Sequence, residues 1–111
     1  MEFSLDGFSF AHLDDSDSLH ERRIFLGLTQ QAVADRAGIP LQSYQQFESG
    51  KRKIRRASFD IACRVLKALE MDIVGFFNGE YAIGEPTVMK DGRHYFKATG
   101  KPYDEEPSDK E

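Results

Sequence analysis

Several features that would place this chain in other protein classes are missing. Cys63 is the only cysteine among the 111 residues, so an intrachain disulfide is impossible. There is no tryptophan, and no apolar run approaches the roughly 20 residues that cross a bilayer. The N-terminus has neither a basic start nor a continuous apolar block, so it does not resemble a secretion signal. We therefore expect a cytoplasmic protein with no membrane segment, and the length fits one compact domain with short appendages.

Catalytic and metal-binding patterns are missing as well. No phosphate loop, Gly-x-Ser-x-Gly or Ser-His-Asp pattern occurs, so we expect that the chain is not an enzyme. The three histidines and Cys63 are not spaced like zinc ligands. The acids between residues 14 and 17 lack the glycine and the bidentate glutamate of a calcium loop, so helix capping is their simpler role. We expect no cofactor and no bound metal.

The acidic net charge of -4 hides a basic middle segment. Residues 19–67 contain ten Lys and Arg against four acids, which gives +6, while the rest of the chain carries -10. Attraction to phosphate acts through the local field within a Debye length, so this distribution matters more than the net charge. A nucleic-acid partner is therefore compatible with the low isoelectric point.

The middle of the chain predicts five short helices separated by Gly and Pro. Thr29 and Ser58 are good N-cap residues, Gly38 suits a left-handed helix terminator, and the fixed φ of Pro40 suits a first helical turn. The expected helices span residues 19–26, from 29 to just before 38, from about 40 to 49, from 58 to about 69, and about 72–77.

Both ends of the chain carry a hairpin signal. Asp6-Gly7 and Asp91-Gly92 each lie between alternating apolar residues, which is typical of a two-residue β-turn. From Lys101 onward the composition is too polar to fold, so we expect a disordered acidic tail that keeps the protein soluble or competes with DNA; we favour solubility. The expected organisation is an N-terminal extension with a possible hairpin (1–18), a helical domain (19–79), a C-terminal hairpin (80–100) and the tail (101–111).

The second and third predicted helices have the properties of a helix-turn-helix unit. Ala34 is small where the two helices would cross, Gly38 supplies the turn, and Ile39 would fill the gap between them. At 100° per residue the third helix directs Tyr44 and Phe47 to the core. Its opposite face is uncharged and rich in amides, comprising Gln42, Ser43, Gln45 and Gln46. Glutamine can make the bidentate hydrogen bonds that read adenine in the major groove.

Residues 19–77 resemble the Xre, Cro and phage-repressor family of DNA-binding domains. The motifs that carry this resemblance are Gly-Leu-Thr-Gln at 27–30, Ala34, Gly38, Ile39, and Glu-Ser-Gly-Lys at 48–51. The resemblance implies a mainly α, five-helix, lambda-repressor-like fold, and the terminal hairpins add small α+β character.

The resemblance also implies the roles of individual residues. The expected base contacts are Gln42, Ser43, Gln46 and Leu41. The expected phosphate contacts are Gln30, Thr29, Gln45, Lys51, Arg52, Lys53 and Arg55. Arg23 and Glu48 match a structural salt bridge of the family. Three positions depart from the family pattern: Pro40 replaces a Ser or Thr cap, Leu41 stands where a polar reader is common, and Glu70 replaces a Gly, so its turn could be strained.

The sequence therefore predicts a sequence-specific regulator of transcription, a repressor, that binds double-stranded DNA as a homodimer. The aromatic residues of the two hairpins are candidates for the dimer surface, either pairing with each other or across subunits: Phe3, Phe8, Phe10, Tyr95 and Phe96. The alternative is a protein-interaction module, such as an antitoxin or an adaptor, that uses the same scaffold and contacts its partner through the hairpins.

Overall fold

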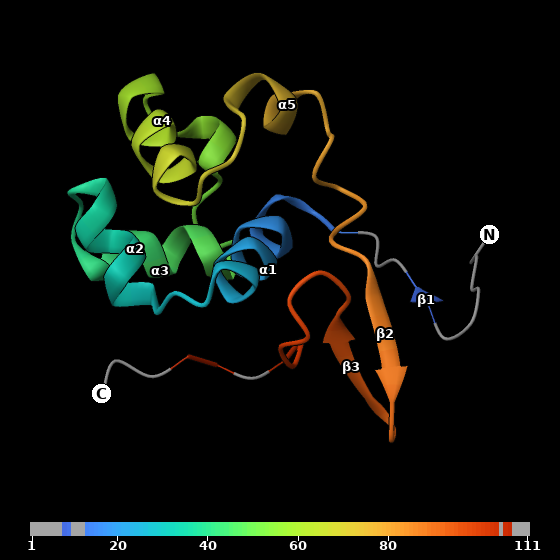
Figure 1. The fold of residues 1–111 in the computed structure, drawn as a ribbon. Coiled ribbons are helices and arrows are strands. Elements are labelled where there is room, and N and C mark those ends of the chain that lie inside the picture. The colour runs from blue at the N-terminus through green and yellow to red at the C-terminus, as the bar shows by residue number, and fades with distance from the viewer. Residues whose placement is uncertain (1–7, 10–12, 105, 108–111) are drawn as a thin grey trace.

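The computed structural model describes residues 8–9, 13–104 and 106–107, which form a helical unit with a small sheet beside it (Figure 1). The helices are α1 (Asp15–Leu26), α2 (Gln30–Ala37), α3 (Leu41–Ser49), α4 (Phe59–Ala68) and α5 (Ile73–Phe77), and a 3-10 turn covers Ile54–Arg56. This confirms the predicted five-helix fold with small α+β character. Among the described helices, none is both long and apolar enough to cross a membrane.

One apolar core holds the helices together. Helix α2 packs against both α3 and α4, and α1 packs against α3. The burial of apolar side chains between these helices removes them from water, which is the main favourable contribution to folding. The most deeply buried side chains come from all five helices and include Leu19, Val33, Tyr44, Phe47, Val65, Leu66, Leu69 and Phe76.

The starts of the helices follow their capping residues. Helix α1 begins at Asp15, four residues before the predicted start, because the Asp14 carboxylate accepts the backbone N–H of Asp17. The predicted caps Thr29 and Ser58 are confirmed, since each hydroxyl oxygen accepts an N–H of its own first turn. Pro40, with φ -62° and ψ 146°, is the N-cap of α3 rather than part of its first turn.

The turn after α4 places a non-glycine residue in the left-handed region. Glu70 has φ 55°, a conformation that costs an L-residue roughly 1–2 kcal/mol. Arg22 offsets part of this cost, because its guanidinium donates to the carbonyls of Leu69 (3.0 Å) and Glu70 (2.9 Å). The departure from glycine noted in the sequence therefore coincides with a strained turn that a side chain from α1 supports.

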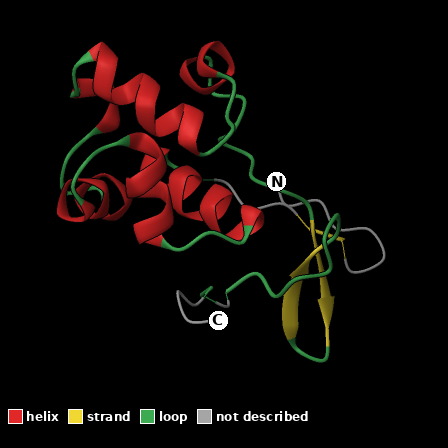
Figure 2. Ribbon diagram, turned by 60° about the vertical axis from the view of Figure 1, so that its left-hand side comes forward, coloured by secondary structure: helices red, strands yellow, loops and turns green. Residues whose placement is uncertain are grey.

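The predicted C-terminal hairpin is confirmed as strands β2 (Thr87–Lys90) and β3 (Arg93–Phe96) (Figure 2). Asp91 and Gly92 form the tight turn, both with positive φ, as this turn type requires. Strand β1 (Phe8–Ser9) pairs antiparallel with β2 and completes a three-stranded sheet in the order β1-β2-β3. The rest of the predicted N-terminal hairpin, including Phe3 and Phe10, lies outside the described residues.

The sheet docks on the helical unit through Phe96. Its ring is fully buried and packs edge-to-face on Phe25 of α1 at 5.3 Å between centroids. Phe96 was expected on a dimer surface, but it is buried within its own chain and cannot contact a second copy. Pairing of the two terminal segments with each other, one of the predicted arrangements, is present for Phe8–Ser9 and β2.

Part of the predicted disordered tail also contacts this domain. Pro102 bridges to Tyr95, and the backbone N–H of Tyr103 donates to the carbonyl of His94 at 2.8 Å. The Tyr103 ring packs 5.2 Å from that of Phe96. The expectation of disorder came from average polarity, whereas a single aromatic side chain supplies the apolar contact that anchors this segment.

A buried carboxylate lies where α1 meets the segment leading to the sheet. Glu21 is 4% exposed, and its Oε1 accepts the backbone N–H of Glu85 at 3.0 Å. Its Oε2 has no hydrogen-bond partner within the described part of the chain. Burial raises the pKa of Glu21 to about 7, so the folded chain holds a proton there that the unfolded chain releases above its ordinary value of 4.5.

We expect this carboxylate to make folding stability depend on pH. Because the pKa of Glu21 is higher in the folded state, its contribution is fully present below pH 4.5 and is lost as the pH rises through about 7. Glu21→Gln keeps the acceptor but carries no charge, so at pH 8 the variant should be more stable than the wild type by about 3 kcal/mol. Urea unfolding at pH 5 and pH 8 measures this, and equal pH dependence in both proteins would contradict it.

Candidate nucleic-acid interface

The turn between α2 and α3 has the predicted construction. Gly38 ends α2 with φ 70°, where a residue with a side chain would be strained. Ala34 is completely buried at the crossing, and the Ile39 N–H donates to the Ala34 carbonyl at 3.1 Å. The Ile39 side chain packs against the core from between the helices. These contacts fix the orientation of α3 relative to α2.

Helix α3 buries one side and presents the other to solvent. Tyr44 and Phe47 are buried, as predicted from their angular position. On the opposite side Gln42 and Gln45 are exposed, while Ser43 and Gln46 are partly exposed. Leu41 is half-buried, and its side chain packs against the edge of the core. The outward face of α3 therefore offers donors and acceptors without any net charge.

A buried ion pair ties α1 to the end of α3. Arg23 donates from Nε to Glu48 Oε1 at 2.8 Å and from Nη2 to Oε2 at 2.7 Å, the pairing expected from the sequence. The two side chains are only 1% and 5% exposed. His20 also contacts Glu48, with Nδ1 at 2.6 Å from Oε2. Such a bidentate, charge-assisted pair is strong because two N–H groups of the guanidinium match the two oxygens of the carboxylate.

The pKa values of this cluster follow from its contacts. Burial opposes ionisation of Glu48, but the hydrogen bonds from Arg23 and His20 outweigh it and lower the pKa of Glu48 to about 2. The hydrogen bond to Glu48 in turn raises the pKa of His20 above its ordinary value. Glu48 is therefore charged throughout the neutral range, and it favours the protonated form of His20.

The ion pair extends to the surface through two glutamines. Gln30, the first residue of α2, donates from its side chain to Glu48 Oε2 at 3.2 Å. The Gln45 amide of α3 then donates to Gln30 Oε1 at 3.0 Å. Thr29, Gln30, Leu41 and Gln45 line one open surface pocket of about 280 Å³. The structure thus brings together predicted base and phosphate contacts from α2 and α3, and holds two of them in fixed positions.

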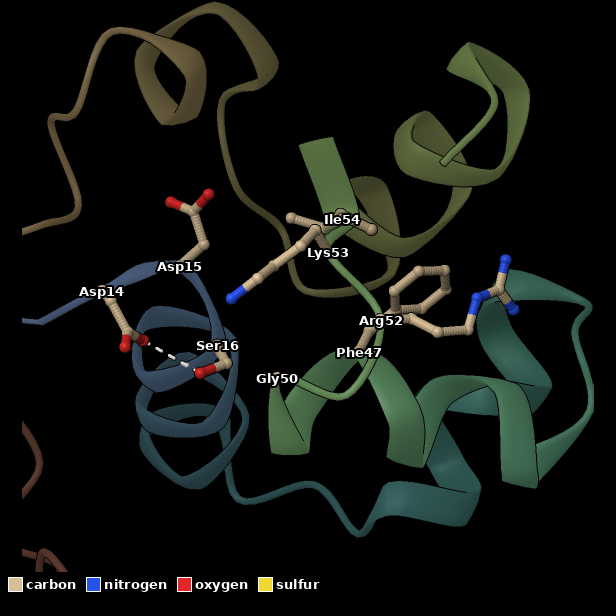
Figure 3. Close-up of a pocket in the computed structure, with 8 residues that line it drawn as sticks. All are labelled: Asp14, Asp15, Ser16, Phe47, Gly50, Arg52, Lys53 and Ile54. Atoms are coloured by element: carbon tan, nitrogen blue, oxygen red, sulfur yellow. Dashed lines mark hydrogen bonds between the residues drawn. The ribbon is translucent and has the colours of Figure 1, made fainter. Parts of the chain in front are cut away.

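The basic run after α3 lies beside the start of α1 (Figure 3). The Arg52 guanidinium lies over the Phe47 ring at 4.8 Å from its centroid, and the Arg52 N–H donates to the Gln46 carbonyl. The Lys53 side chain extends toward Asp14 and Ser16. Lys51, Arg52 and Lys53 are all exposed, and none of them forms an ion pair with a carboxylate of the described residues. Their charges are therefore available to an anionic partner.

Arg55 differs from the other predicted phosphate contacts. Its guanidinium pairs with the Asp15 carboxylate and donates to the carbonyls of Phe76 and Phe77, each at 3.3 Å. It also lies 5.3 Å from the centroids of both phenylalanine rings. These contacts join α1 to the C-terminal end of α5, where a cation is favourable. These contacts engage the Arg55 guanidinium within its own chain, while the side chain stays 42% exposed and its contact with phosphate remains a prediction.

Two residues of the cluster were missed in the sequence. His20 lies one turn before Arg23 on the same side of α1, so its i,i+3 spacing was an available signal. Glu106 contacts Arg23 from 83 positions away, and no local pattern indicates such a contact. Among the described residues, no group of three or more His, Cys, Asp or Glu side chains is placed to hold a metal ion.

The helical unit matches a known protein family. A family model described as helix-turn-helix matches residues 19–76, which is just over half of the chain. The matched segment begins within α1 and ends one residue before the end of α5. No curated protein matches the chain. The matched segment contains the α2–α3 unit, the buried ion pair and the basic run described above.

Proposed function

Because this chain belongs to the Xre/Cro type of helix-turn-helix family, a family of DNA-binding regulatory domains, we propose that it is a transcriptional repressor that reads double-stranded DNA. In this proposal α3 enters the major groove. Gln42 and Gln46 contact base edges, with Ser43 and the Leu41 side chain beside them. Gln30, Thr29 and Gln45 contact phosphate at the start of α2, and Lys51, Arg52 and Lys53 contact it after α3.

The observation that carries this proposal is the outward face of α3. It is largely exposed and uncharged, with three amides, and exposed cations follow directly after the helix. Exposed helix faces usually carry Lys, Glu and Arg, whereas amides offer paired donors and acceptors that fit a base edge. Cations beside such a face supply affinity for phosphate without selecting a sequence. The division of roles between the two sets matches what a sequence-reading protein requires.

Specific binding by this domain calls for two copies. One recognition helix reads only a few base pairs, so we propose a homodimer on a roughly palindromic site with half-sites about 34 Å apart, one turn of DNA. Occupying such a site in a promoter would be enough to block transcription, which is why we propose repression.

The proposal predicts how binding depends on salt. Each phosphate contact contributes a slope of about -0.9 to a plot of log K against log salt concentration. Lys51→Ala combined with Arg52→Ala should therefore make the slope shallower by about 2 per subunit and weaken binding to all duplexes similarly. Fluorescence anisotropy with a labelled duplex at 50 to 200 mM salt measures both effects.

The control is Lys67→Ala combined with Lys90→Ala, which removes the same charge from exposed positions on α4 and β2. This pair should leave the slope within about 0.5 of the wild-type value, since both lysines are on elements outside the proposed DNA surface. Equal slopes for the two double variants would show that Lys51 and Arg52 do not contact phosphate. Thermal melting of each variant checks that it is folded.

A further inference from the structure

The C-terminal segment returns to the helical unit after the sheet (Figures 1 and 2). It is fixed on the way by the Tyr103 ring against Phe96, by the Tyr103 N–H bond to His94, and by an ion pair between Asp104 and Arg93 at 3.5 Å. These three contacts direct the chain back toward α1 and the start of α2. The residues that follow are therefore delivered to one place on the surface.

At that place Glu106 binds the buried ion-pair cluster from outside. Its Oε1 lies 3.0 Å from Arg23 Nη1, and its Oε2 accepts from Nη2 at 3.3 Å. The His20 Nε2 lies 3.9 Å from the same Oε2. The Glu106 side chain is 59% exposed, so the contact caps a buried cation without being enclosed itself. An exposed carboxylate held in this way can leave at little cost.

Glu106 also covers part of the proposed DNA surface. Glu106 and Pro107 line the same open pocket as Thr29, Gln30, Leu41 and Gln45. Two of these residues are at the N-terminus of α2 and the other two are on α3. A phosphate approaching the start of α2 would meet the Glu106 carboxylate and the Pro107 ring.

We propose that Glu106 and Pro107 form an autoinhibitory strap. Glu106 takes the place of a DNA phosphate at the start of α2, and it must leave before DNA binds. This inference rests on the proposed function. Charge supports it, because residues 104–111 carry five acids and one base. Glu106 and a DNA phosphate have the same sign and meet at the same pocket, so they exclude each other both sterically and electrostatically.

The strap predicts tighter DNA binding when it is removed. The apparent dissociation constant is the intrinsic value divided by the fraction of open molecules, so a strap closed 80–90% of the time weakens binding about 5- to 10-fold. A chain ending at Asp104 should therefore bind DNA about 5- to 10-fold more tightly than the full chain. Glu106→Gln in the full chain should lower the logarithm of the dissociation constant by at least about half as much. Asp91→Asn is the control, because it removes one exposed acid at the hairpin turn, where Asn is well tolerated.

A second measurement follows the strap itself. In NMR spectra of the full chain without DNA, Glu106→Gln should shift the side-chain signals of Gln30 and Arg23, whereas Asp91→Asn should not. Adding saturating duplex should move the backbone amide signal of Glu106 to the position it has in an isolated peptide of residues 99–111.

The outcomes separate the strap from the function it regulates. If the full and shortened chains bind DNA equally well, or if Asp91→Asn gains as much as Glu106→Gln, the strap is refuted while DNA binding stands. If the Glu106 amide keeps its position when duplex is bound, the strap is also refuted. If neither the full chain nor the chain ending at Asp104 binds any duplex, both the proposed function and the strap are refuted.

Discussion

Glu48→Ala should lower the free energy of unfolding by about 3–5 kcal/mol, the cost of breaking a buried ion pair from one side. The substitution leaves the Arg23 guanidinium, whose side chain is 1% exposed, without its bidentate partner. His20 and Gln30 lose an acceptor on the same carboxylate. The charge that stays buried, more than the lost attraction, accounts for most of the effect. Urea unfolding at pH 7 measures it.

The effect of this substitution should depend on pH. The pKa of Glu48 is lowered to about 2 in the folded chain, so its contribution is present above the ordinary value of 4.5 and is lost as the pH falls toward 2. The stability difference between wild type and Glu48→Ala should therefore narrow as the pH falls below about 4.5. Asp104→Ala is the control, because it breaks an exposed ion pair that is worth less than about 1 kcal/mol.

Glu48→Ala should also separate stability from recognition. Below its melting temperature the variant should still prefer the same DNA sequence, since the side chains proposed to read bases are on the opposite side of α3. An unchanged melting temperature would refute the structural role of the pair. A changed sequence preference in a fully folded variant would show that Glu48 acts in recognition through Gln30 and Gln45.

The core of this fold was accessible from the sequence because its signals are local. Thr29 and Ser58 indicate helix starts because their hydroxyl oxygens accept N–H groups of the first turn, and Gly38 indicates the left-handed turn. Tyr44 and Phe47 fall on one side of α3 by the period of the helix alone. The start of α1 was misplaced because Asp14, Asp15 and Asp17 all suit a helix start, and only the bond from the Asp17 N–H selects Asp14 as the cap.

The contacts that the sequence did not predict join distant parts of the chain. Arg55 was counted with its basic neighbours, yet Asp15 and the carbonyls of α5 hold it, and those partners are at least 21 positions away. Glu106 seemed part of a solvated tail because its neighbours are acidic, but the Tyr103 ring places it beside Arg23. Such contacts between residues far apart in the sequence depend on the assembled fold, so neither composition nor local patterns predict them.

The second large effect concerns the glutamines of α3. Gln42→Ala combined with Gln46→Ala removes two proposed base readers while the phosphate contacts stay. Each bidentate amide contact to a base is worth roughly 1–3 kcal/mol of discrimination. Together their loss should weaken binding to the preferred site on the order of 100- to 1,000-fold. Binding to unrelated duplexes should change little, because it depends on cations that the variant keeps. Asn78→Ala, an exposed amide after α5, is the control and should bind like wild type.

The most direct measurement is the ratio of affinities for a preferred duplex and for a shuffled duplex of the same composition, at one salt concentration. The preferred duplex is first selected from a random library by the full wild-type chain. We predict a ratio of about 1,000 or more for the wild type, falling about 100-fold or more in the double glutamine variant. A wild-type ratio near one, or a ratio that the glutamine substitutions leave unchanged, would contradict the account and favour a protein partner for this surface.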